Sequence, residues 1–156
     1  MRKSHFFILS LLFAVSSRSK SCEQFCASLE ISVTKLRSQK GMVRVLLAAD
    51  AKNFQESNPK DVKAGQVYFR ETSADQEKIL FVFPKLDAGT YAFKVIHDEN
   101  NNKTLDTNLL GIPTEGLAVS HRSRISPNMV NFEKAKFKLL PSKKKTFEAP
   151  MLYVDR

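Results

Sequence analysis

The sequence predicts an all-β protein, an antiparallel β-sandwich of seven to eight strands. Short segments alternate apolar and polar residues with period two, which is the pattern of a half-buried strand. Turn-forming residues separate these segments at short intervals, and no segment shows the spacing of a convincing amphipathic helix. The 12 phenylalanines are enough to fill a core between two sheets.

Two strand candidates open the predicted domain. Apolar and polar residues alternate over residues 29–35, which indicates a half-buried strand. Residues 42–48 form a short, almost continuous apolar run, which favours a buried strand over a helix. The turn at residues 38–41 joins the two, so we expect a hairpin. Residues 50–63 are polar and rich in helix and strand breakers, so we expect a surface loop there.

Three further strands are expected at residues 66–72, 78–84 and 91–96. Their large apolar side chains are the expected core, namely Phe69, Phe81, Phe83, Tyr91, Phe93 and Val95. For residues 78–84 the pattern leaves open which alternate set points inward, because both sets are apolar.

The last third of the chain also reads as short strands. Residues 117–120 are a brief strand candidate, and residues 121–128 form a basic loop. In residues 132–140 every second position from 134 to 138 is a lysine, and mostly apolar residues lie between them, which predicts a strand with a solvent-exposed, lysine-lined face. Residues 147–154 close the chain as a strand weakened by Pro150.

The first residues resemble a secretory leader. Arg2 and Lys3 precede the apolar run at residues 6–15, and serines follow that run. We expect cleavage between Ser17 and Cys22, so that the mature protein begins between residues 18 and 22. We therefore divide the chain into a signal peptide (residues 1–21) and one β-sandwich domain (residues 22–156). The apolar run is shorter than the roughly 20 residues that span a bilayer, so we expect no transmembrane segment and a secreted or periplasmic protein.

The net charge limits which partners the protein can attract, and the cysteines limit how the start of the domain is linked. The chain has 25 basic and 16 acidic residues, and losing four basic residues with the leader leaves 21 against 16, or +5. This excess suits an anionic surface or glycan, or only solubility.

Cys22 and Cys26 stand close together at the start of the domain. They are a short-range disulfide, a lipidation site at Cys22, or a pair without a role.

The segment after residue 97 carries the clearest chemical pattern. Oxygen-bearing side chains stand at every second position, at Asp98, Asn100, Asn102, Thr104 and Asp106. This spacing lets a looped backbone wrap oxygen ligands around a hard cation such as calcium. The alternative is a turn-rich connection without an ion, because Asn and Asp satisfy their own backbone.

Other candidate sites have simpler explanations. His97 beside two acids invites an acid–base or zinc hypothesis, but a lone His at a strand end is more often structural. Ser120 and His121 are neighbours on a strand and point to opposite faces, without a nucleophile motif around them. The lysines of residues 134–145 suit a solvated edge, and few aromatic residues lie between them, so nucleic acid is not expected.

Several segments resemble one family in their order and spacing. A strand ends in His-Asp-Glu-Asn, an Asp stands eight residues past the first Asp, and a Leu-Gly-Ile-Pro box follows. These segments are residues 86–92, 97–100, 105–106, 110–116 and 132–135. Together they resemble the secreted bacterial proteins of the domain of unknown function 2141 family. The resemblance implies a periplasmic or extracellular, prealbumin-like β-sandwich and little about activity.

The loop is also similar to the calcium loops of surface-adhesin B-type repeats. The family pattern usually has glycine where this chain has Asn101 and Lys103. Asn tolerates the left-handed backbone that glycine adopts there, whereas Lys does so at a cost. Lys103 also places a positive charge beside the expected ion.

We therefore expect an exported, prealbumin-like or immunoglobulin-like β-sandwich that acts as a binding or structural module of the cell envelope. Its partner would be an envelope protein, a glycan or an anionic surface, and its only expected cofactor is calcium in the loop. The sequence favours this role over an enzyme. The alternative is a small hydrolase or ligand carrier with a pocket beside His97, Asp98 and Glu115.

Overall fold

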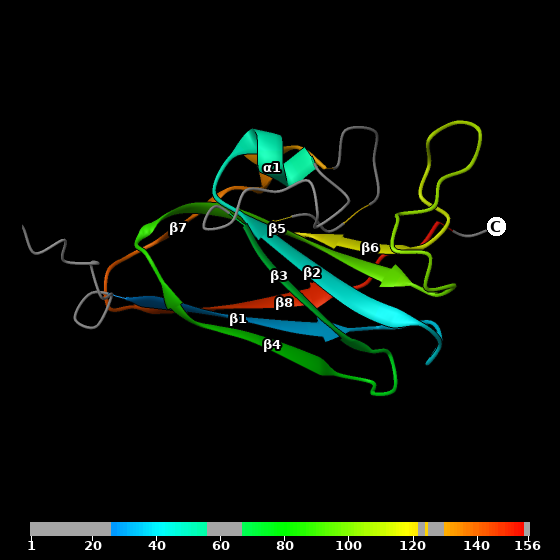
Figure 1. Cartoon of the computed structure of the whole chain (residues 1–156), viewed down its shortest axis with the longest axis horizontal. Coiled ribbons are helices and arrows are strands. Elements are labelled where there is room, and N and C mark those ends of the chain that lie inside the picture. Colours follow the sequence, from blue (N-terminus) through cyan, green and yellow to red (C-terminus); the bar gives the residue numbers. More distant parts are fainter. Residues whose placement is uncertain (1–25, 56–66, 122–123, 125–129, 155–156) are drawn as a thin grey trace, which may run out of the picture.

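The computed structural model describes residues 26–55, 67–121, 124 and 130–154, and in this part the chain forms two packed β-sheets (Figure 1). The smaller sheet has the order β4-β1-β8 and contains β1 (Ala27–Thr34), β4 (Ile79–Leu86) and β8 (Lys144–Pro150). The larger sheet has the order β3-β2-β5-β6 and contains β2 (Met42–Ala48), β3 (Val67–Ser73), β5 (Gly89–Asp98) and β6 (Gly116–Val119). The short β7 (Phe137–Leu139) pairs with β5. The predicted all-β sandwich is confirmed.

The predicted hairpin of the first two strands is wrong. β1 pairs with β4 and, in parallel, with β8, whereas β2 pairs with β3 and β5 in the other sheet. Lys35 and Gly41, at φ of 59° and 73°, turn the chain from one sheet to the other. Both strands carry apolar residues toward the space between the sheets, and facing each other across that space buries them better than pairing edge to edge would.

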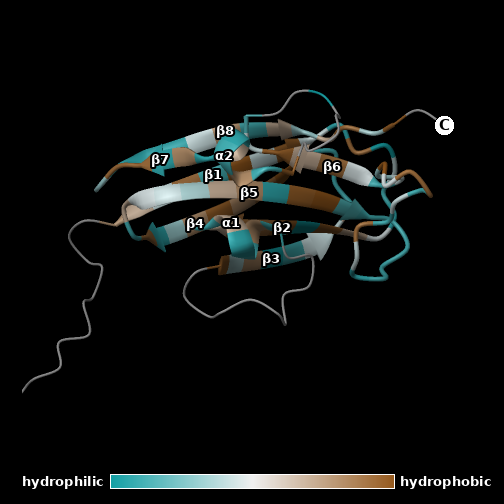
Figure 2. Cartoon of the chain, turned by 90° about the horizontal axis from the view of Figure 1, so that it is seen from above, coloured by the Kyte–Doolittle hydropathy of each residue, from teal (hydrophilic) through white to brown (hydrophobic). Residues whose placement is uncertain are grey.

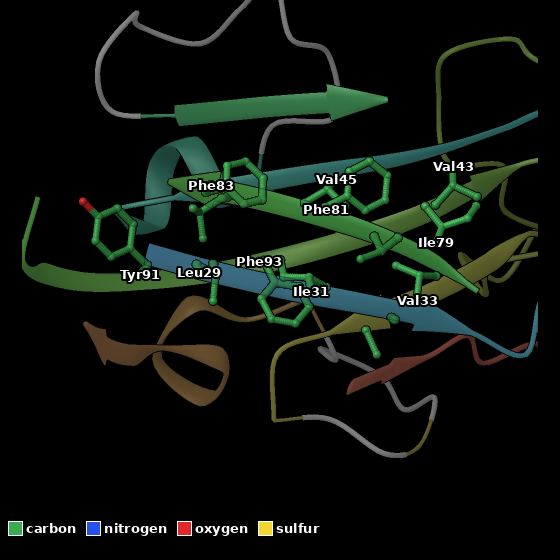
Figure 3. Packing of buried hydrophobic residues seen from close by; sticks show 14 of the residues in the cluster. Leu29, Ile31, Val33, Val43, Val45, Ile79, Phe81, Phe83, Tyr91 and Phe93 are labelled. Carbon is green, nitrogen blue, oxygen red and sulfur yellow. The ribbon is translucent and has the colours of Figure 1, made fainter. Parts of the chain in front are cut away.

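The main core lies between the two sheets. In β4 the side chains that point inward are those of Ile79, Phe81 and Phe83, at 5%, 5% and 1% exposure. This decides which of the two alternate sets of β4 residues belongs to the core. Figure 3 shows these side chains packed against those of β1 and against Tyr91 and Phe93 of β5. The predicted core residues are confirmed except one. Phe69 is only partly buried and lies on the other face of its sheet, opposite Leu46 of β2.

Two short helices cover the outer face of the larger sheet and were not expected from the sequence. They are α1 (Ala51–Gln55), in the predicted surface loop, and α2 (Phe132–Ala135), in the predicted strand of residues 132–140. In Figure 2 both lie over the sheet that contains β2 and β5. Phe54 and Phe132 meet edge to face at 5.9 Å, so the helices close a second, smaller apolar cluster.

Each helix starts at a capping residue. The Asp50 carboxylate accepts the Asn53 amide at 2.9 Å, and the Asn131 side chain accepts the Lys134 amide at 3.1 Å. Side chains of this type satisfy amides that a helix start leaves without a partner. The helices are too short to show amphipathic periodicity, and the caps were the available signals.

The remaining expectations about the chain ends are tested only in part. The leader and its cleavage site lie outside the described residues, as does most of the basic loop of residues 121–128. Cys26 is disulfide-bonded, whereas Cys22 lies outside the described residues. Within the described part, no helix is long and apolar enough to cross a membrane.

Candidate functional site

The predicted ion-binding segment begins where β5 ends. We call residues 98–106 the Asp98 loop. Asp98 is fully buried, and its carboxylate accepts the backbone amides of Asn102 at 3.1 Å and Lys103 at 2.8 Å. The backbone therefore wraps around this carboxylate.

Two residues of the Asp98 loop have left-handed backbone. Asn101 has φ of 58° and Lys103 has φ of 71°. These are the two positions where the sequence departs from glycine in the family pattern, so the structure confirms the predicted need for unusual backbone there. Counted from Asp98, Lys103 is the sixth residue, and calcium loops of the EF-hand type place glycine at that position.

The side chains at the other predicted ligand positions converge. The amide nitrogens of Asn100 and Asn102 donate to the two carboxylate oxygens of Asp106, at 2.7 and 2.8 Å. The side-chain oxygen of Asn100 accepts the backbone amide of Asn102. The side-chain oxygen of Asn102 accepts both the backbone amide and the hydroxyl of Thr104. The five predicted residues therefore form one connected hydrogen-bond network.

Arg44 of β2 is the part of the site that the sequence did not reveal. Its Nη1 lies 3.0 Å from the Asp98 carboxylate, and its Nη2 donates to the side-chain oxygen of Asn101 at 2.7 Å. Its Nε lies 3.3 Å from Glu71, without a hydrogen bond. Arg44 is nearly as buried as Asp98, at 7% side-chain exposure. The only sequence signal was a charge that interrupts an apolar strand.

Glu115 holds the Asp98 loop to the start of β6. Its two carboxylate oxygens accept the backbone amides of Glu99 at 3.0 Å and Asp106 at 3.2 Å. Burial raises the pKa of Glu115, because the charged form loses water there. Glu99 pairs with Arg37 and accepts the Ser38 hydroxyl at 2.6 Å. The hydrogen bond from Arg37 lowers the pKa of Glu99.

His97 is fully buried and uses both ring nitrogens within the protein. Nε2 lies 2.9 Å from the Lys40 carbonyl, and Nδ1 lies 2.7 Å from the Tyr153 hydroxyl. A carbonyl only accepts, so Nε2 donates to it, and in the neutral ring Nδ1 then accepts from the Tyr153 hydroxyl. The Tyr153 oxygen also accepts the Arg37 amide at 3.1 Å. These contacts make His97 a connector between the β1–β2 segment and the C-terminal segment.

Ser120 has a comparable internal role. Its hydroxyl accepts the Phe93 amide at 3.1 Å and donates to the Ala135 carbonyl at 2.8 Å. The His121 ring packs against the rings of Phe137 and Phe147. The described contacts place these two side chains in separate environments.

Two cavities of the described part of the chain lie beside the Asp98 loop and along β3 and β4. A small one beside the Asp98 loop is lined by Arg44, Leu46, Phe69, Lys94, Ile96, Lys103 and Thr104. A groove of about 580 Å³ is lined by residues from β3, β4 and the segment between them. Neither is lined by His97, Asp98 or Glu115.

Among the described residues no group of three or more His, Cys, Asp or Glu could hold a metal ion, so an ion at the Asp98 loop would depend on amide and carbonyl oxygens.

The chain was compared with known proteins. Neither curated proteins nor solved structures gave a match. A family model described as an uncharacterized protein conserved in bacteria (DUF2141) matches residues 31–148, which includes nearly all the described strands and the whole Asp98 loop. This chain therefore belongs to the DUF2141 family.

Proposed function

We propose that this protein is an exported binding or structural module of the cell envelope, and that its Asp98 loop binds calcium. One observation carries the calcium proposal. The side chains of Asn100, Asn102 and Asp106 meet in a loop whose backbone wraps around the Asp98 carboxylate. Oxygen ligands from a looped backbone are what calcium prefers.

The donor set fits a weak site. Asp98 and Asp106 supply two negative charges, and each carboxylate has lone pairs beyond the hydrogen bonds described. Asn100 and Asn102 would have to turn their amide oxygens toward the ion, which gives up the bonds to the amides of Asn102 and Thr104. Arg44 and Lys103 add positive charge nearby. We therefore expect a dissociation constant of about 10⁻⁴–10⁻³ M, the range of extracellular modules.

The role of a module is favoured over that of an enzyme. A hydrolase or carrier at this end of the sandwich would need a concave pocket with convergent polar groups beside His97. Instead both His97 nitrogens have protein partners, and both Glu115 oxygens accept backbone amides. Export is supported by the leader-like residues 1–21 and agrees with the expected calcium affinity.

The calcium proposal is tested by thermal melting of the purified protein with calcium, with magnesium and with chelator. Calcium at about 100 times its dissociation constant should stabilise the fold by roughly 2.7 kcal/mol, because only the folded loop binds it. Asp106→Asn should remove that stabilisation by deleting a charged ligand.

Asp75→Asn is the matched control. Asp75 lies in the β3–β4 connection and accepts a hydrogen bond from Ser73, and it is not one of the expected ligands in the Asp98 loop. This variant should keep the full calcium response. Melting curves that superimpose with calcium and with chelator would rule out the calcium site.

A further inference from the structure

The most exposed apolar side chains of the described chain stand together on one turn. We call residues 107–114 the Leu109 turn, which connects the Asp98 loop to Glu115 and β6. Leu109 is 106% exposed and Leu110 is 83% exposed. The other exposed large apolar residues described, Leu80, Val82 and Leu140, are at 54%, 39% and 58%. Figure 1 shows the segment as a free-standing loop at one end of the sandwich.

The Leu109 turn is closed by its own hydrogen bonds. The Asn108 side-chain oxygen accepts the amides of Leu110 at 2.9 Å and Ile112 at 3.0 Å. The Gly111 amide donates to the Asn108 carbonyl, and the Asn108 amide donates to the Ile112 carbonyl, both at 2.9 Å. Pro113 has no amide hydrogen. Four of the five backbone amides of residues 108–112 are therefore paired within the turn, and the exception is Leu109.

The base of the turn is fixed as well. Thr107 and Pro113 form a β-bridge, and the Thr114 amide donates to the Asp106 carbonyl at 2.9 Å. Gly111 has φ of 72° with open space around it, so its left-handed backbone is a requirement of the turn and not of packing. Hydrogen bonds within the turn and at its base therefore fix a backbone conformation in which Leu109 and Leu110 point into solvent.

A lipid surface suits this tip better than a protein partner. Residues 107–114 contain no charged side chain, although 26% of the whole chain is charged. A specific protein interface buries about 800 Å² per partner, which a narrow, convex tip does not offer. A bilayer can surround a convex tip, and pairing of most of the tip's amides within the turn lowers the cost of bringing its backbone to the lipid boundary. The net charge of +9, or +5 without the leader, adds attraction to anionic headgroups.

We propose that the Leu109 turn inserts Leu109 and Leu110 into the headgroup boundary of an anionic lipid bilayer. This inference rests on the envelope location proposed above and names the partner of the module. It does not depend on calcium.

The first test measures binding of the purified protein to sedimented vesicles of phosphatidylglycerol and of phosphatidylcholine. The wild type should bind the anionic vesicles more strongly. Leu109→Ser together with Leu110→Ser should weaken that binding by about a hundredfold, since each buried leucine contributes about a factor of ten or more. The double variant should melt like the wild type, because both side chains face solvent.

Leu140→Ser is the matched control. Leu140 is also an exposed leucine beside a turn, between β7 and β8, and its replacement should leave vesicle binding unchanged. Comparing variants of one chain also cancels any vesicle binding by the apolar residues 6–15. Equal binding by the wild type and the double serine variant would overturn the proposal, and so would a wild type that binds neither vesicle.

A second test reports insertion directly. The chain contains no tryptophan, so Leu109→Trp places the only indole at the tip. Its fluorescence should shift to the blue and be quenched by brominated lipid chains, whereas Leu140→Trp should show neither change. A Leu109→Trp emission that stays unshifted on anionic vesicles would refute insertion.

Two further outcomes separate this inference from others. If Asp106→Asn loses its response to calcium but still binds vesicles, lipid binding stands whatever the role of calcium. If the wild type is a dimer by light scattering and the double serine variant is a monomer that binds vesicles equally well, the turn contacts a second copy and the lipid proposal fails.

Discussion

At the scale of single residues, Arg44 and Asp98 form the most consequential contact of the site. The guanidinium of one strand and the carboxylate at the end of its neighbour lie 3.0 Å apart, at 7% and 0% side-chain exposure. Such a pair adds little net stability against an apolar replacement, but it becomes costly when one partner is removed. Its role is to give the buried Asp98 side chain a charged partner and a fixed orientation at the end of β5.

We predict that Arg44→Met and Asp98→Asn each lower the free energy of unfolding by about 3–5 kcal/mol, because each leaves a buried partner uncompensated. The double variant should lose clearly less than the sum of the two. Chemical denaturation measures all three values. Additive losses would show that the two residues do not depend on each other.

The residues of the Asp98 loop could be predicted because they are close in sequence. A period of two in oxygen side chains between residues 98 and 106 already placed them in one loop. Arg44 could not be predicted as their partner, because its contact with Asp98 depends on which strand lies beside β5. For the same reason, the tie from Glu115 to the amides of Glu99 and Asp106 appears only in the folded chain.

At the scale of elements, the loops carry backbone strain that the strands do not. Among the described residues, five that are not glycine have positive φ, and Lys35 and Lys103 are the two lysines among them. Left-handed backbone costs such a residue about 1–2 kcal/mol relative to its usual conformation. Lys103 is the one that also places its charge in the Asp98 loop.

We predict that Lys103→Gly and Lys35→Gly each raise the free energy of unfolding by about 1 kcal/mol through relief of this strain. Only Lys103→Gly should also enlarge the stabilisation by calcium, because it removes a positive charge beside the ion. Melting with calcium and with chelator measures both effects. An equal calcium response in the two variants would exclude Lys103 as the limit on affinity.

Strands were predictable from alternation, whereas pairing and short helices were not. The limits of β2 follow directly from its apolar run, and β5 follows from its aromatic alternation. α1 and α2 are single turns fixed by Asp50 and Asn131 and by burial of Phe54 and Phe132, which is tertiary context. The expected β1–β2 hairpin failed because sequence adjacency does not say which sheet a strand joins.

At the scale of the whole molecule, one end of the sandwich is joined by side chains that cross from sheet to sheet. Arg37 follows β1 of the smaller sheet, and Glu99 follows β5 of the larger sheet. The Arg37 guanidinium also lies 4.6 Å from the centre of the Tyr153 ring. Within the larger sheet, Gly41 lets the chain before β2 pass close to the end of β5, because a Cβ there would lie 2.0 Å from the Asp98 carbonyl oxygen.

The contacts of Glu99 and Glu115 should make the free energy of unfolding depend on pH. Arg37 holds the pKa of Glu99 below its ordinary value of 4.5, so the stability it contributes is present above pH 4.5 and is lost as pH falls through the lowered pKa. Glu115 acts in the opposite sense, because burial raises its pKa and its charged form opposes folding at higher pH.

We predict that Glu99→Gln removes about 1 kcal/mol or less at neutral pH, since the pair is partly exposed. It should also flatten the acid side of the stability curve. Urea unfolding between pH 3 and 7 measures both. An acid limb as steep in Glu99→Gln as in the wild type would contradict the assignment.

The parallel pairing of β1 with β8 governs when the protein can finish folding. Ser28 is matched with Lys144 and Thr34 with Pro150, so the central strand of the smaller sheet receives its second neighbour only from the last part of the chain. Contacts between such distant residues slow folding, because a long loop must close before they form. A ribosome delivers β8 last, so the sheet cannot be completed on a partial chain. The smaller sheet therefore lacks one of its three strands until residues 144–150 have been synthesised, whereas every strand of the larger sheet is already present by then.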